Sequence, residues 1–269
     1  MRLVVHLSDL HFGSIDESLL QPLIAQIREI APDVVVVSGD LTQRARSAQF
    51  RQARAFLDAL PTPQIVVPGN HDVPLYNVFA RFLGPLDKYR KYISRDLEPV
   101  FVDSRIAVVG LNSARSLTIK NGRLNPEQLE RVRSRLAPLP ERLTKIVVTH
   151  HPLDLPSNPS DKDLIGRARL AMQTFAACGV DILLAGHVHV GDAGSTAQRY
   201  RALGRAALVV NAGTATSTRG RGQANSFNVI RIDEPVVTVE CWAWQPARAG
   251  FAAGAPERFV RAEDGWRAA

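Results

Sequence analysis

The chain has 269 residues, of which 45% are hydrophobic and 22% charged, a composition typical of a globular protein with one large domain or two small ones. No run approaches the roughly 18 apolar residues that cross a bilayer, so we expect no membrane partner. Two cysteines, Cys178 and Cys241, are too few for a disulfide scaffold, and a cytoplasmic protein is therefore expected.

The chain is strongly basic, with a formal net charge of +7 and a pI near 9.9. This charge has two interpretations, which are attraction to anionic ligands such as phosphates or nucleic acid, and arginines spread over solvated helix faces. The apolar N-terminal stretch contains His6 and runs directly into the first motif, so we expect no cleaved signal peptide.

The first part of the chain alternates between short β-branched runs and longer helical patterns. Strands are expected at residues 2–7, 34–37 and 65–67, and helices at residues 19–30 and 47–60. This alternation implies parallel pairing with right-handed crossovers. Tyr76 to Leu97 has weak helical spacing and many Arg, Lys and Tyr residues, and we expect it to cap a site.

The middle of the chain continues the alternation, and the pattern then changes. Strands are expected at 100–102, 106–111, 145–149 and 181–184, with helices at 126–136 and 165–177. Beyond residue 195, strands at 198–203, 207–211, 227–232 and 236–244 follow one another without helices. They predict a second, largely antiparallel sheet. A domain at 1–245 is expected, followed by a loose, flexible tail at 246–269 that is rich in Ala, Arg and Gly.

Seven Asp, Asn and His side chains fall at the ends of five expected strands. They are Asp9, His11, Asp40, Asn70, His150, His187 and His189. In α/β sheets, ligands bind beyond the carboxyl ends of the strands. Each residue alone is more often a turn or core residue, so the prediction of a metal site rests on the five coincidences together.

The set mixes carboxylate, amide and imidazole groups without thiolates, which suits Mn, Fe, Zn or Co. Two ions about 3.5–4 Å apart need a bridging carboxylate, and such a pair can bind phosphate and generate hydroxide near neutral pH. Asp40 is the best bridging candidate because it stands alone at its strand end. Gly39, Gly69 and Gly186 each precede a candidate ligand and permit a sharp turn there, although ordinary strand-to-helix turns would also use them.

These motifs together resemble the calcineurin-like metallophosphoesterases. The matching segments are Asp9-Leu10-His11, Gly39-Asp40, Gly69-Asn70-His71-Asp72, His150 and Gly186-His187-Val188-His189. The resemblance implies an α/β fold in which a two-sheet β-sandwich is flanked by helices, a four-layer αββα arrangement. Within the family, the opening segment and the chain length look like bacterial cyclic-nucleotide and glycerophosphodiester phosphodiesterases.

The resemblance also implies roles for single residues. One metal ion would be held by Asp9, His11, Asp40 and His189, and the other by Asp40, Asn70, His150 and His187. By the same similarity, His71 faces the substrate, where it stabilises developing charge or protonates the leaving oxygen, and Asp72 orients it. His151 either supports the ligands or is structural. No expected ligand is missing, which counts against a scaffold that has lost its metals.

We therefore expect hydrolysis of a phosphodiester in a small molecule, such as a 3′,5′-cyclic nucleotide, by a metal-activated hydroxide. Arg44 and Arg46 are candidate phosphate contacts, with a solvated helix start as the alternative, and Asn112 is a weaker candidate. The alternatives for the whole chain are a nuclease or a phosphomonoesterase with the same site, and a non-catalytic interaction module. Nucleic acid is a less favoured partner, and the sequence is compatible with an oligomer.

Overall fold

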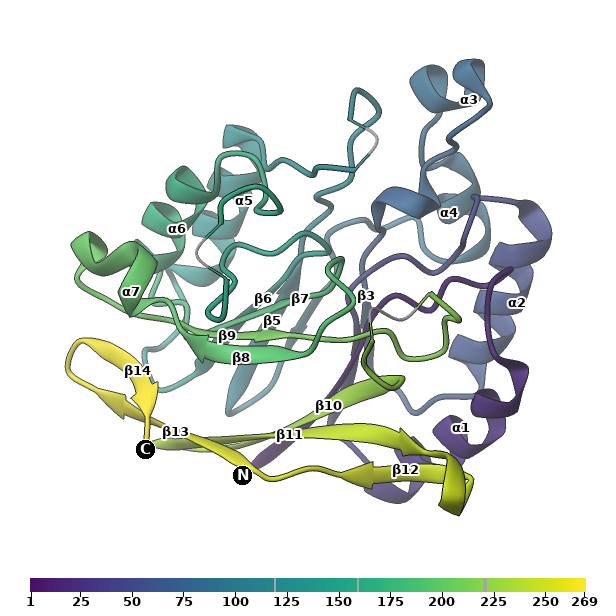
Figure 1. Ribbon diagram of the computed structural model, residues 1–269. Coiled ribbons are helices and arrows are strands. Elements are labelled where there is room, and N and C mark those ends of the chain that lie inside the picture. The colour runs from purple at the N-terminus through teal and green to yellow at the C-terminus, as the bar shows by residue number, and fades with distance from the viewer. Residues whose placement is uncertain (119, 159, 220–221) are drawn as a thin grey trace.

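The computed structural model describes residues 1–118, 120–158, 160–219 and 222–269, and the account of the fold concerns these residues. Two β-sheets lie face to face in the middle of the molecule, and helices cover the outer face of each sheet (Figure 1). This four-layer arrangement confirms the αββα fold that the motifs imply.

The first sheet contains the N-terminal and the C-terminal strands. Its hydrogen-bonded order is β14 (Gly265–Ala268), β13 (Glu257–Ala262), β11 (Val236–Gln245), β10 (Ser226–Asp233), β1 (Arg2–Leu7), β2 (Val34–Val37) and β3 (Gln64–Val66), with β12 (Gly250–Ala253) paired to β11. Strands β1, β2 and β3 are parallel, as their alternation with helices predicts. The four valines of β2 are fully buried, because both faces of the strand are covered.

The second sheet is built around the middle of the chain. Its order is β4 (Val100–Val102), β5 (Ile106–Gly110), β6 (Thr144–Val148), β7 (Ile182–Ala185), β9 (Leu208–Asn211) and β8 (Asp192–Ser195). The four inner strands are parallel, and β4 and β8 are antiparallel at the two edges. The carboxyl ends of β6 and β7 therefore point in one direction and can meet the ends of β1 to β3.

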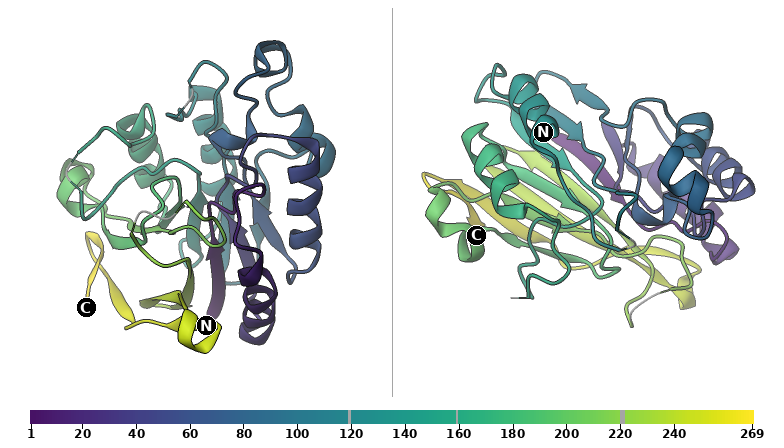
Figure 2. Two further views of the ribbon diagram at one scale, coloured as in Figure 1. Left: turned by 45° about the vertical axis from the view of Figure 1, so that its right-hand side comes forward. Right: turned by 90° about the horizontal axis from the view of Figure 1, so that it is seen from above.

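Helices cover both outer faces (Figure 2). Helices α1 (Leu20–Ile30), α2 (Ser47–Asp58) and α4 (Asp87–Tyr92) pack on the first sheet, and α5 (Pro126–Leu136) and α6 (Ala168–Ala177) pack on the second. Side-chain alternation along β1 sends Val5 towards the helices and Val4 into the layer between the sheets. The shorter elements are η1 (Glu17–Leu19), η2 (Asn70–Asp72), α3 (Val78–Leu83), α7 (Ala197–Tyr200), η3 (Arg201–Leu203) and η4 (Pro246–Arg248).

The expectation of a separate antiparallel sheet after residue 195 is wrong. Strand β9 pairs in parallel with β7, and β10 joins the first sheet beside β1. Residues 198–203 form α7 and η3 instead of a strand. There the Tyr200 hydroxyl donates to the carbonyl of Leu153 at 2.7 Å, and Arg199 pairs with Asp154 at 2.6 Å. The side chains of this segment thus contact a neighbouring loop from a short helix.

The expected loose tail is also wrong over most of its length. Residues 250–268 form β12, β13 and β14, and β13 pairs with β11 along the edge of the first sheet. Trp266 is 1% exposed and packs in the layer between the sheets, where its indole N–H lies 3.3 Å from Oδ1 of Asp181. Composition alone misleads here, because the buried side chains of Phe251, Phe259 and Trp266 anchor a segment that otherwise looks like a linker.

We expect Trp266→Ala to lower the free energy of unfolding by about 3 to 5 kcal/mol, because truncation of a buried aromatic ring leaves a cavity. Urea unfolding followed by circular dichroism measures this loss. The control is the exposed neighbour Arg267, whose replacement by Ala should change stability by no more than about 0.5 kcal/mol. Equal stability of the two variants would show that the C-terminal strands add nothing to the core.

Candidate metal centre

Five strand ends from the two sheets converge at one edge of the sandwich. They carry Asp9 and His11 after β1, Asp40 after β2, Asn70 after β3, His150 after β6, and His187 and His189 after β7. The first three strands belong to one sheet and the last two to the other. The structure therefore brings together all seven side chains that the sequence singles out, across the interface between the sheets.

Most of these side chains leave the backbone at strained residues. The angle φ is 53° at Asp9, His11 and Asp40, 73° at His187 and 59° at His189. A left-handed φ at a residue with a side chain is uncommon and costs of order 1–3 kcal/mol. Strain of this kind persists where the surrounding structure enforces it, and here it turns each side chain away from its strand and towards the centre.

Two glycines allow the strand ends to approach closely. A Cβ atom on Gly69 would lie 2.1 Å from Oδ1 and 2.3 Å from the backbone nitrogen of Asp40. A Cβ atom on Gly186 would lie 1.7 Å from Oγ of Ser8 and 2.6 Å from Oδ2 of Asp9. Both contacts are shorter than van der Waals contact, so only glycine fits at either position.

The first cluster consists of Asp9, His11, Asp40 and His189. The Nε2 atom of His189 lies 3.0 Å from Oδ1 of Asp9 and 3.1 Å from Nε2 of His11. The His11 ring nitrogen is in turn 3.7 Å from Oδ2 of Asp40. One candidate donor atom from each residue lies within 4.8 Å of all the others, and all four residues are buried.

The second cluster adds Asn70, His150 and His187 to the other face of Asp40. Oδ1 of Asp40 is 3.3 Å from Nε2 of His150. Oδ1 of Asn70 lies 3.1 Å from that same nitrogen and 3.1 Å from Nδ1 of His187. The two carboxylate oxygens of Asp40 therefore face different clusters, which is the arrangement that a bridging ligand requires.

The arrangement of these nitrogen and oxygen atoms favours metal binding over hydrogen bonds among the atoms themselves. Oδ1 of Asp9 is buried and has no hydrogen-bond partner among the described residues, although Nε2 of His189 lies 3.0 Å away. Nε2 of His11 faces Nε2 of His189, and two such nitrogens can form a hydrogen bond only if one carries a proton. A shared cation would satisfy all of these atoms, and the residues present therefore fit the two ions that the family would place here.

His151 lies beside the centre, but its ring nitrogens are already used. Nδ1 is 2.8 Å from Oγ of Ser113, and Nε2 is 2.8 Å from the carbonyl oxygen of Lys120. Although its ring is close to His150 and His187, neither nitrogen is available to a metal ion. Of the two roles left open by the sequence, the contacts favour the structural one.

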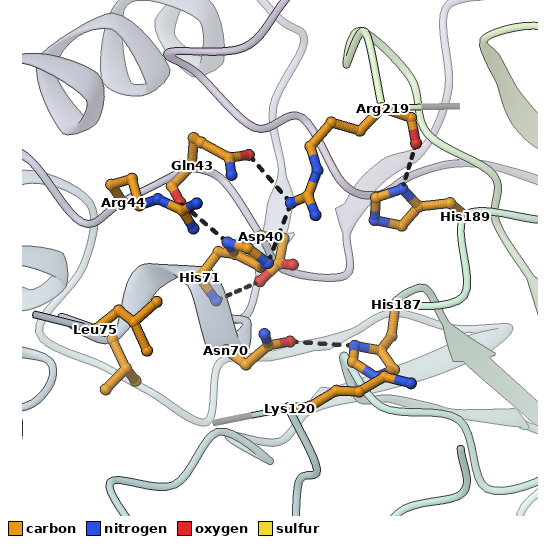
Figure 3. A pocket seen from close by; sticks show the side chains of 11 residues that line it. Asp40, Gln43, Arg44, Asn70, His71, Leu75, Lys120, His187, His189 and Arg219 are labelled. Atoms are coloured by element: carbon orange, nitrogen blue, oxygen red, sulfur yellow. Dashed lines mark hydrogen bonds between the residues drawn. The ribbon is translucent and has the colours of Figure 1, made fainter. Parts of the chain in front are cut away.

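His71 projects into the space above the two clusters. Its backbone N–H donates to Oδ1 of Asp40 at 2.8 Å, and Nδ1 lies 3.0 Å from the carbonyl oxygen of Gln43. Because a carbonyl only accepts, Nδ1 carries a proton and Nε2 is left to face Arg219, whose Nη1 is 3.4 Å away. Figure 3 shows the His71 ring between Gln43 and Arg219.

Asp72 has a different position from the one expected by resemblance. Its carboxylate accepts hydrogen bonds from the backbone N–H groups of Leu41, Thr42 and Gly69, at 3.1, 2.9 and 2.9 Å. It thus ties the turn after Asp40 to the turn before Asn70, while Gln43 orients the His71 ring. Burial and the neighbouring charge of Asp40 raise the pKa of Asp72 to about 6.

Buried charges shift the pKa values of the centre in opposite directions. Burial alone would raise the pKa of Asp40, but the nearby His150 and His11 hold it well below its usual value. Burial would lower the pKa of His150, but Asp40 raises it to about 9. Burial and the charge of His150 lower the pKa of His187 to about 4. Asp40 and His150 thus stabilise each other as an ion pair when no metal is bound.

A cavity of about 320 Å³ opens above the clusters (Figure 3). It is lined by Asp40, Gln43, Arg44, Asn70, His71, Val73, Leu75, Lys120, His187, His189 and Arg219. Val73 and Leu75 belong to the segment between β3 and α3, just before the expected capping segment, and residues 76–97 are not among the lining residues. Lys120 and Arg219 were not foreseen from the sequence, because both lie in irregular loops far along the chain from the motifs.

The three predicted substrate contacts have different positions. Arg44 lines the cavity, whereas Arg46 is exposed at the start of α2 and is not among the lining residues. Asn112 borders two other cavities with Arg115 and Asn125, beside α4 and α5. The prediction for Asn112 is therefore wrong in position, because the turn after β5 leads away from the centre.

The sandwich and its His- and Asp-lined edge define a metallophosphoesterase fold. The chain belongs to the calcineurin-like phosphoesterase family, whose model matches residues 2–191. In the described residues, no helix has the length and apolar character needed to span a membrane.

Curated relatives of this chain include two kinds of phosphodiesterase. The 3′,5′-cyclic adenosine monophosphate phosphodiesterase CpdA of Escherichia coli (strain K12) is 28% identical over 159 residues, which cover 58% of this chain and 54% of the relative. A probable glycerophosphodiester phosphodiesterase GpdQ of Arcobacter nitrofigilis is 28% identical over 201 residues, covering 70% of this chain and 71% of the relative. The match thus spans about half the length of CpdA.

Solved structures with the same fold are more distant in sequence. A dimetal phosphatase from Danio rerio superposes with a TM-score of 0.67 at 15% identity, covering 94% of this chain and 98% of that one. The purple acid phosphatase PPD1 of yellow lupin superposes with a TM-score of 0.69 at 15% identity, covering 96% of this chain and 53% of that one. These similarities concern the fold alone.

We expect Gly69→Ala to lose metal and to lower turnover of a generic diester by about 100-fold, because the added methyl group displaces Asp40. Metal content by mass spectrometry and initial rates measure the two effects. Gly250→Ala is the matched control, since its Cβ would be 3.6 Å from its nearest neighbour. A Gly69→Ala protein with full metal content and full turnover would contradict the placement of Asp40.

Proposed function

We propose that this chain is a phosphoesterase that uses two metal ions to hydrolyse phosphodiesters of small molecules, with 3′,5′-cyclic nucleotides as one class of substrate. The position of Asp40 carries this proposal, because its carboxylate lies between two clusters of metal-type donors on the floor of a cavity. The names of the relatives CpdA and GpdQ support a diester as the substrate. A cytoplasmic location is part of the same proposal.

The residues divide between the two ions as the family motifs suggest. Asp9, His11, Asp40 and His189 would hold one ion, and Asp40, Asn70, His150 and His187 would hold the other. Ions of the Mn, Fe, Zn or Co type suit these donors. Bound there, the pair would polarise the phosphoryl group and lower the pKa of the attacking water.

His71 is placed to act on the substrate rather than on a metal ion. The carbonyl of Gln43 fixes the proton on Nδ1, so Nε2 is the nitrogen that meets the substrate. Burial lowers the pKa of His71 below its ordinary value, so the ring must take up a second proton, on Nε2, before it can donate to the leaving oxygen or to the phosphoryl oxygen as charge develops. Asp72 supports this geometry indirectly, since it holds the two turns that carry Asp40 and Asn70.

Three cationic side chains border the cavity and would position a phosphate. Among the described residues, Arg44 and Arg219 form no ion pair with a carboxylate, and Lys120 pairs with Asp163 at 2.5 Å. An unpaired guanidinium can bind two oxygens of one phosphate. These cations would also suit the second charge of a monoester, so a phosphomonoesterase is the second candidate function.

We expect Asp40→Ala to lose both metal ions and activity, and His71→Ala to keep the ions while kcat falls by about 100-fold to 10,000-fold. The first change removes the bridging donor, and the second removes only a proton donor that faces the substrate. Metal analysis and steady-state kinetics on the same preparations separate the two outcomes. An empty centre in His71→Ala would assign that residue to metal binding instead.

A substrate panel on metal-reconstituted protein tests the proposed activity. We expect turnover of a generic diester and of a cyclic nucleotide to exceed that of a generic monoester, and to stop after exhaustive chelation. Arg44→Gln should raise KM about tenfold through loss of a charged phosphate contact, whereas Arg46→Gln should leave KM unchanged because Arg46 lies outside the cavity. Monoester preference or chelator-resistant turnover would contradict the diesterase proposal, and a preference for single-stranded DNA would contradict a small molecule as the substrate.

A further inference from the structure

Helix α3 has the reverse of the usual distribution of charged and apolar side chains. Phe79 is 81% exposed and Leu83 is 85% exposed, and Val78 and Phe82 are also exposed. The charged residue of the same helix, Arg81, is only 6% exposed. A surface helix normally buries its apolar face and solvates its charges, so this helix is built to present apolar groups outwards.

Arg81 connects α3 to a second exposed segment. Its Nε donates to the carbonyl oxygen of Ser116 at 2.7 Å, Nη1 to Pro74 at 3.0 Å, and Nη2 to Thr118 at 2.5 Å. Leu117, between two of these acceptors, is 83% exposed. The buried guanidinium thus holds two loops together and keeps their apolar side chains in solvent.

Exposed apolar side chains lie on α3, just before it, and on the loop that Arg81 ties to it, and we call this group the apolar lip. It consists of Tyr76, Val78, Phe79, Phe82, Leu83 and Leu117. Helix α3 and the neighbouring loop project from the top of the molecule, away from both sheets, in Figure 1 and in the left view of Figure 2. Single exposed apolar residues are common, but a group of large ones on a projecting tip marks an interaction site.

The apolar lip adjoins the cavity of the candidate metal centre, and positive charges lie around it. Leu75 and Lys120 line that cavity; Leu75 directly precedes Tyr76, and Lys120 lies three residues after Leu117. The guanidinium of Arg44 lies 5.6 Å from the centre of the Tyr76 ring. Lys120 and Lys162 border a shared depression with Thr118, next to Leu117.

We propose that the apolar lip enters the surface of a lipid bilayer that carries anionic headgroups. Aromatic and leucine side chains on a projecting tip, surrounded by Lys and Arg, are the combination that interfacial segments use. Headgroup phosphates would pair with Lys162, and with Lys120 in exchange for its partner Asp163, while the apolar side chains leave water. The expectation of no membrane partner concerned spanning segments, whereas this contact requires none.

The same charges argue against a second copy of the chain as the occupant. A symmetric dimer places one patch against itself, so Arg44, Lys120 and Lys162 would meet their own counterparts. Like charges brought together at an interface oppose association. The convex shape of the two projecting loops also suits insertion into a soft surface.

Vesicle sedimentation tests the proposal independently of catalysis. We expect the protein to bind vesicles of equal parts phosphatidylglycerol and phosphatidylcholine, to bind pure phosphatidylcholine more weakly, and to lose anionic binding as salt rises. The double variant Phe79→Ser and Leu83→Ser should reduce binding by at least about tenfold through lost apolar burial. Leu117→Ser should reduce it by a smaller factor.

The matched control is Val100→Ser with Val102→Ser, which changes two exposed apolar residues on β4, outside the lip. It should bind vesicles like the unchanged protein. Metal content and turnover of a soluble diester report folding, and both should stay unchanged in all these variants. Equal vesicle binding by the lip variant and the control would overturn the proposal. So would absence of vesicle binding together with a dimer in light scattering that the lip variant alone abolishes.

Discussion

The arrangement of the centre depends on one carboxylate, that of Asp40, which is shared between donors from two different sheets. Its Oδ2 faces His11 from the first sheet, and its Oδ1 faces His150 from the second. Close contact across the sandwich edge requires Gly69 to touch Asp40 with its backbone. It also requires the chain to turn sharply just after each strand, so five of the seven donors adopt a left-handed φ. The fold thus accepts local strain so that the donors converge.

Electrostatics governs the balance between protons and metal ions in such a cluster. Buried carboxylates are costly unless they are paired. Asp40 holds the pKa of His150 near 9, so this imidazole carries the balancing charge at neutral pH. A metal ion needs the neutral imidazole, and binding must therefore displace that proton. Protons and metal ions compete for one set of atoms, and acid favours the protons.

The converging donors could be predicted from the sequence because each follows a strand directly, and parallel strand ends meet at one edge. Arg219 could not be predicted, since it reaches His71 from a loop without periodicity. The sequence expects Asp72 to orient the His71 ring, but its carboxylate accepts from backbone N–H groups, and only coordinates distinguish these two partners. The C-terminal strands escaped prediction because three aromatic residues, Phe251, Phe259 and Trp266, anchor a segment with the composition of a linker.

The candidate metal centre buries charged side chains, whereas the apolar lip exposes apolar ones, and both are contrary to the usual pattern. One stretch of chain connects the two. Residues 70–83 begin with Asn70 among buried charges and end with Leu83 in solvent. Within this stretch, Arg81 is buried, and its apolar neighbours on the same helix are exposed. Buried charges and exposed apolar side chains both lower stability, so selection for stability alone would keep neither. If both proposals hold, their proximity at the cavity places the proposed reaction beside an anionic, partly apolar surface.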